Sequence, residues 1–213
     1  MTAFGRIRAV WTARSTGAEA GRRSVLAALT GRLAGPSAPT ICVLVFRGVS
    51  SSEIDLPVTR LADRMGARVV FVGPRLGAVH AVEPSRSVVV ETAPAEAPTA
   101  DVLVVPGGLG WKQVLEHGEV REWLASTAAS ARGVLAMSTG SWLLASVGGL
   151  DGREAAGHWL ADGELAALGA TVSTCRTATD DGGRVVTASG ARAALGVVDA
   201  LADHVRWAQW APS

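Results

Sequence analysis

The chain has 213 residues, of which 48% are hydrophobic and 25 are glycine, and its formal net charge is +1. This length and composition are typical of one compact α/β domain with many tight turns. Lys112 is the only lysine and no basic tract is present, so nothing in the charge pattern indicates nucleic-acid binding. No run of about eighteen apolar residues predicts a membrane span.

Cysteine and histidine usage argues against a metal centre. The chain has two cysteines, Cys42 and Cys175, no CxxC pair and four scattered histidines. We therefore expect no metal site, and the absence of a complete glycine-rich phosphate loop predicts no cofactor. Two unpaired thiols fit a reducing cytoplasm, where we place the protein.

Residues 1–39 differ in composition from the rest of the chain. They hold six arginines and a single acidic residue, Glu19, and they end in a linker-like stretch at 35–39. The apolar spacing in 22–33 predicts one short helix. We interpret 1–39 as an N-terminal extension and 40–213 as the domain.

The first half of the domain alternates strands and helices. The apolar run 41–46 predicts a parallel strand that is buried on both faces, and 53–65 predicts a helix that ends at Gly66. A second strand follows at 67–73, and 79–90 predicts a hairpin-like excursion with a strand over 87–90.

The second half begins with a buried strand at 101–105, which leads directly into Pro106-Gly107-Gly108. Next come a helix over 119–130, a strand over 134–137 and a helix over 141–147, with only a sharp turn between the last two. A helix over 162–168 follows. Further strands at 172–174 and 185–188 are joined through a turn at 180–183. A long amphipathic helix covers 191–207.

Alternating strands and helices predict an α/β fold with a mostly parallel sheet and helices on both faces. In such sheets, ligands bind beyond the carboxyl ends of the strands. Three loops lie there, at 47–53, 106–111 and 138–141. They supply Glu53, the Gly107-Gly108 pair and Ser138, which is a sensible arrangement for addition or acyl chemistry. The alternative is an ordinary set of caps and turns.

Several ordered motifs make the chain similar to a known family. They are Val104-Val105-Pro106-Gly107-Gly108, then Val134-Leu135-Ala136-Met137-Ser138-Thr139-Gly140-Ser141, then Gly149-Leu150-Asp151-Gly152-Arg153, then Gly157-His158-Trp159. Over about residues 40–207 the sequence resembles the DJ-1/PfpI (ThiJ) superfamily, and most of all its isocyanide hydratases and the ligand-binding halves of AraC-type regulators.

The resemblance implies a flavodoxin-like α/β sandwich that is commonly a homodimer. It also implies a Cys nucleophile on a strained strand-to-helix turn, the nucleophile elbow, with a carboxylic acid beside it. Carried over, Ser138 takes the nucleophile position, Glu53 is the acid partner, Thr139 lies beside the nucleophile and His158 lies near the pocket. The candidate substrate-binding residues are Gly107, Gly108, Trp111, Gly140, Trp142 and Trp159. The tryptophans fit a flat apolar pocket or, equally, core or interface packing.

The departure from the family pattern is Ser138, where the family has Cys. A serine hydroxyl needs a general base to become a nucleophile, and a carboxylate alone is a weak one. Three explanations stay open. His158 acts as the base, Ser138 is not a nucleophile, or Ser138 replaces a natural Cys. Gly157 also differs from the Thr that usually precedes this His-Trp pair.

Two functions follow from these residues. The first is a small-molecule enzyme similar to isocyanide hydratase, with hydration, lyase or related acid–base chemistry at a C–N or carbonyl centre. Glu53 is its general acid/base, and Ser138, Thr139 and backbone amides orient the substrate. The second is a non-catalytic ligand-binding or regulatory domain that has lost the nucleophilic Cys. A small-molecule ligand is expected in both, without nucleic acid or membrane.

Overall fold

A computed structural model describes residues 38–159 and 162–208. The helix expected over 22–33, and nearly all of the extension expected over 1–39, lie outside these residues. None of the helices in the described ranges is long and apolar enough to cross a membrane.

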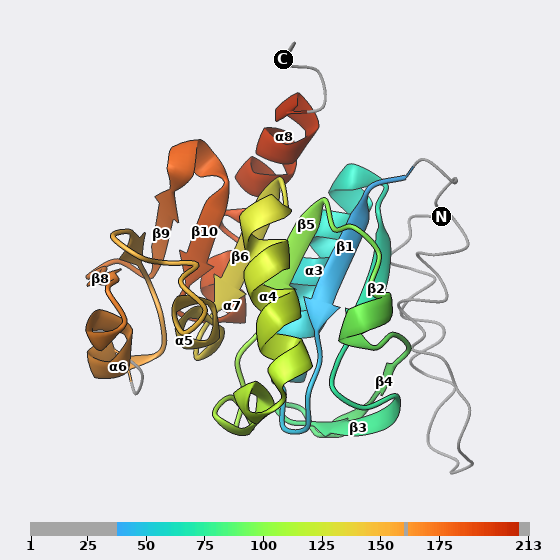
Figure 1. The fold of residues 1–213 in the computed structure, drawn as a ribbon. Helices are drawn as coiled ribbons and strands as arrows, with labels where there is room; N and C mark the ends of the chain where they lie inside the picture. Colours follow the sequence, from blue (N-terminus) through green and yellow to red (C-terminus); the bar gives the residue numbers. More distant parts are fainter. Residues whose placement is uncertain (1–37, 160–161, 209–213) are drawn as a thin grey trace.

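Six strands form the central sheet in the order β2-β1-β5-β6-β10-β9 (Figure 1). Neighbouring strands are parallel from β2 to β10, and only β9 runs antiparallel, against β10. The strands are β1 (Thr40–Leu44), β2 (Arg68–Val72), β5 (Val102–Val105), β6 (Gly133–Met137), β9 (Thr177–Asp180) and β10 (Val185–Ala188). The predicted mostly parallel sheet is confirmed.

The strands at the centre of the sheet are continuous apolar runs because helices cover both of their faces. All residues of β1, β5, β6 and β10 are buried. One face carries α3 (Ser51–Met65), α7 (Ala191–Ala194) and α8 (Val198–Ala208), and the other carries α4 (Gly118–Ser130) and α5 (Gly140–Ala145) (Figure 1). This is the layered α/β arrangement that the sequence predicts.

Smaller elements lie around this sandwich. Strands β3 (Gly77–Ala81) and β4 (Arg86–Val90) form an antiparallel hairpin, as expected for 79–90. Strands β7 (Glu154–Ala155) and β8 (Thr171–Val172) form a short parallel pair, and α6 (Asp162–Ala167) lies between them in the sequence. The 3₁₀ helices are η1 (Pro94–Glu96), η2 (Gln113–Glu116) and η4 (Asp181–Gly183).

Two predictions for the C-terminal part are wrong. The strand expected at 172–174 does not pair with 185–188, because β9 lies next to the turn and forms the hairpin with β10. The single helix expected over 191–207 is broken into α7 and α8. Gly196, a poor helix former, lies in the break, and its N–H bonds to the Ala193 carbonyl, three residues back, in place of the α-helical partner.

Candidate active site

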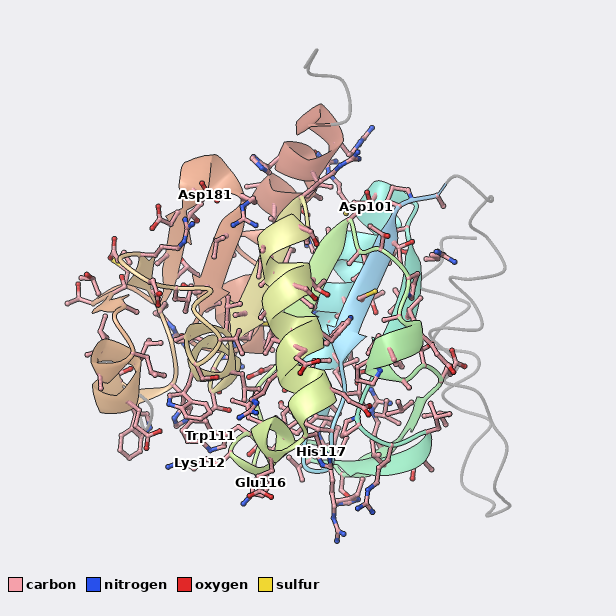
Figure 2. The ribbon with its side chains drawn as sticks, in the orientation of Figure 1. Asp101, Trp111, Lys112, Glu116, His117 and Asp181 are labelled. Carbon is pink, nitrogen blue, oxygen red and sulfur yellow. The ribbon has the colours of Figure 1, made fainter. Side chains whose placement is uncertain are left out.

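The carboxyl ends of β1, β5 and β6 meet at one edge of the sheet and bring the three predicted loops together. Figure 2 shows Trp111 and Lys112 at this edge, toward which the β1 arrow points, whereas Asp101 and Asp181 lie at the opposite edge. The elements that carry the candidate residues are therefore the start of α3, the loop after β5 and the turn from β6 into α5.

The turn from β6 into α5 is sharp and strained. Ser138 has a φ of +54°, which is uncommon for a residue other than glycine. Its N–H donates to the Ala188 carbonyl at 2.8 Å, which fixes the turn against β10. Gly140 follows closely because a Cβ there would stand 2.1 Å from the Val105 carbonyl oxygen. The predicted elbow geometry is present, with Ser138 partly exposed at its tip.

Glu53, in the first turn of α3, is the buried acid of this region, with 5% of its surface exposed. Its Oε2 accepts a hydrogen bond from the Gly107 N–H at 2.6 Å, and its carboxyl group also bonds to the Ser138 side chain. Burial raises the pKa of Glu53 to about 7, and the Glu83 carboxylate raises it further, against the lowering effect of the Gly107 and Ser138 hydrogen bonds. Glu53 thus exchanges its proton near neutral pH.

The glycine pair after β5 lies against both the elbow and the loop after β1. The Gly108 N–H donates to Thr139 Oγ1 at 3.0 Å, and the Gly107 N–H is bonded to Glu53. Gly108 has a φ of +144°, and a Cβ on it would lie 2.2 Å from the Gly48 carbonyl oxygen, so only glycine fits. Both amides are therefore engaged by side chains of the protein, and Thr139 holds the loop to the elbow.

The Thr139 N–H is the amide left for a ligand at the elbow. In the described part of the chain no hydrogen bond uses it, and it lies close to Gly107, whose Cβ, if present, would be 2.8 Å away. A backbone donor at the start of a helix is suited to stabilising negative charge that develops on a substrate.

Two hydroxyls that sequence reasoning missed fasten the segment before His158. Ser141 Oγ donates to the Ala156 carbonyl at 2.7 Å, and the Ala156 N–H donates to Thr187 Oγ1 at 2.8 Å. Ser141 and Thr187 are fully or almost fully buried. Their positions in an apolar helix start and a buried strand were the available signal, because a buried hydroxyl needs a partner.

His158 lies next to this fastened segment. Gly157 is in contact with the elbow, since a Cβ on it would lie 3.5 Å from the Ser138 carbonyl oxygen. The His158 ring contacts the Trp159 ring, with centroids 5.7 Å apart, and Trp159 is 73% exposed. The expected pocket-lining position of Trp159 is thus a position at the surface.

Trp111 and Trp142, by contrast, contact each other edge to face, with ring centroids 4.5 Å apart. Lys112 Nζ lies over the Trp111 ring, 4.9 Å from its centroid, and forms an ion pair with Glu164 of α6 at 2.8 Å. The two indoles and Lys112 join the loop after β5 to α5 and α6. Within the described ranges, no group of three or more His, Cys, Asp or Glu side chains is placed to hold a metal ion.

Comparison with known proteins places this geometry in a family. The family model for the DJ-1/PfpI family matches residues 39–203. Isonitrile hydratase of Pseudomonas putida is 34% identical over 110 residues, which are 52% of this chain and 47% of that protein, so the match spans about half the length of this relative.

Solved structures share the fold. A ThiJ/PfpI family protein from Pseudomonas syringae aligns with a TM-score of 0.69 at 23% identity, covering 85% of this chain and 78% of that one. DJ-1 of Schizosaccharomyces pombe aligns with a TM-score of 0.63 at 15% identity, covering 81% of this chain and all of that one. With the matched residues spanning the sheet, the elbow and the start of α3, the chain belongs to the DJ-1/PfpI family.

Proposed function

We propose that the protein is an acid–base hydratase that adds water to a small, uncharged isonitrile or a similar unsaturated C–N compound. The observation that carries this proposal is Glu53. This acid is buried, bonded to the Gly107 N–H and to Ser138, and has a pKa near 7. A group that exchanges its proton near the working pH is suited to act as both acid and base in one cycle. The similarity to isonitrile hydratase supplies the substrate class.

The reaction closes without a covalent intermediate. Protonated Glu53 donates its proton to the terminal carbon of R–N≡C, and water attacks the nitrilium carbon that results. The Glu53 carboxylate takes a proton from that water, which gives R–N=CH–OH, and this tautomerises to the formamide R–NH–CHO. One water is added, and Glu53 ends protonated as it began.

The other site residues take orienting roles in this proposal. The Ser138 hydroxyl, bonded to Glu53, holds the carboxyl group toward the substrate and offers a hydrogen bond to the attacking water. Thr139 contributes its N–H, while its hydroxyl and Gly108 keep the loop in place. Gly140 permits the elbow to approach β5. Trp111 and Trp142 provide an apolar wall, and His158 and Trp159 form the outer rim.

The test is hydration of an alkyl and an aryl isonitrile in ¹⁸O-labelled water, with the formamide followed by mass spectrometry. We expect the label in the formamide, and Glu53→Gln is expected to lower turnover at least about 100-fold because it removes the transferable proton. Glu122→Gln, at an exposed position of α4, is the matched control and keeps its turnover. Unlabelled product, or a Glu53→Gln enzyme as active as the original, contradicts the proposal.

A second candidate is a ligand-binding domain without turnover. Ser138 favours it, because a serine hydroxyl bonded to a carboxyl group with a raised pKa is a poor nucleophile. Saturable binding of isonitriles by calorimetry, with no formamide formed over many hours, distinguishes this function from catalysis.

Three wider features also belong to the proposal. The protein acts as a homodimer in the cytoplasm on a small-molecule substrate, residues 40–213 form the domain, and residues 1–39 are a separate extension. Sedimentation of the full chain beside a variant that starts at residue 39 tests the assembly and the division together.

A further inference from the structure

The turn of the β3–β4 hairpin, residues 82–84, lies across the start of α3, and we call it the strap. The Ser51 N–H donates to the Val82 carbonyl at 2.7 Å, and the Ser52 N–H donates to the Glu83 carbonyl at 3.2 Å. Ser51 Oγ donates to the Pro84 carbonyl at 2.7 Å. The first N–H groups of a helix usually bond to a capping side chain, but Ser50 makes no such bond, so the strap takes that role.

The strap holds Glu83 in one backbone position. Glu83 has a φ of +57°, a conformation that a glutamate keeps only where its surroundings impose it. The Val82 N–H donates to the Val49 carbonyl at 2.8 Å, which ties the strap to the loop after β1 as well. Glu83 is thus fixed beside Ser52, the residue that precedes Glu53.

The charges around Glu53 single out Glu83. On its own helix, Asp55 is paired with Arg86 of β4. The loop after β5, the elbow and the start of α7 bring Gly107, Ser138 and Gly190 to Glu53, none of which is charged. Glu83 is exposed and forms no ion pair with a described residue, and its charge acts on Glu53 directly.

We propose that Glu83 is a positioning residue of the site, whose carboxylate the strap fixes beside Glu53 so that its charge favours the proton-carrying form of that acid. The inference rests on the proposed role of Glu53 as the proton donor. A like charge beside a buried acid opposes the second negative charge, so Glu53 holds its proton to higher pH. The exposed position of Glu83 makes this control adjustable by solvent ions.

The test compares Glu83→Asn with Glu83→Asp. Both residues tolerate a positive φ, so the pair differs in charge and not in backbone fit. Glu53 is titrated without substrate, through the infrared carbonyl band of its protonated carboxyl group, which Glu53→Gln identifies by its loss. We expect Glu83→Asn to lower the midpoint on the order of half a pH unit, and Glu83→Asp to restore most of it.

Glu91→Gln, at the other end of the same hairpin, is the control and leaves the midpoint unchanged. Equal midpoints in Glu83→Asn and the original protein overturn the inference, and so does an equal shift in Asn and Asp, which would assign the effect to the backbone of the strap. Since the titration needs no turnover, it stands or falls separately from isonitrile hydration.

Discussion

The elbow and the start of α3 meet at the site, but they are held in different ways. The elbow is a backbone structure, with Ser138 at positive φ and Gly140 against the Val105 carbonyl, and it tolerates few residues whatever the chemistry. The start of α3 is positioned by the strap, and its important feature is a side chain, the buried Glu53. In this chain the elbow therefore provides shape, and α3 provides the titratable group.

The largest expected effect breaks the elbow. Gly140→Ala places a methyl group about where the Val105 carbonyl oxygen lies, at 2.1 Å, and backbone cannot yield cheaply there. We expect a loss of roughly 3 kcal/mol or more in the free energy of unfolding, measured in urea. Gly163→Ala, in the short helix α6 with open space around it, is the matched control and is expected to be neutral or slightly stabilising. Equal stability of both variants would refute the close approach.

A comparable effect reports on α3 through pH. The pKa of Glu53 is raised from 4.5 to about 7, so the folded state holds this proton more tightly than the unfolded state. Its contribution is fully present below pH 4.5 and is lost as the pH rises through 7. We expect a fall of roughly 3 kcal/mol in unfolding free energy across that window. Glu53→Gln removes this part of the pH dependence and Glu122→Gln keeps it. An unchanged slope in Glu53→Gln would contradict the buried acid.

The smallest effect sharpens the difference between backbone and side chain at the elbow. Ser138→Ala keeps the backbone but removes the hydroxyl that bonds to Glu53. We expect turnover to fall about tenfold or less, the value of one hydrogen bond. A loss on the order of 10⁴-fold would instead make Ser138 the nucleophile. Steady-state kinetics with the same isonitrile distinguishes the two outcomes.

Much of the fold could be predicted because local pattern and tertiary structure agree in it. The runs that became β1, β5 and β6 are apolar throughout, and their carboxyl ends brought Glu53, Gly107 and Ser138 to one edge. The break between α7 and α8 was missed because the apolar spacing continues through it, and the one local signal was Gly196.

The partners of the site groups were harder to predict. The sequence indicated that Gly107 and Gly108 would offer N–H groups to a ligand, but not that Glu53 and Thr139 would occupy both. The strap was also unforeseen, since its bonds join residues about thirty positions apart and leave no local periodicity. Contacts of this kind depend on how the elements are packed.

Lys112 has a practical consequence. Its ammonium lies on the face of Trp111, at the sheet edge that carries the site, and no other lysine occurs in the sequence. An amine-reactive dye therefore has one side-chain target, apart from an α-amino group. Labelling would set a fluorophore against an indole quencher, which turns the rim of the site into an optical reporter of any compound that displaces it.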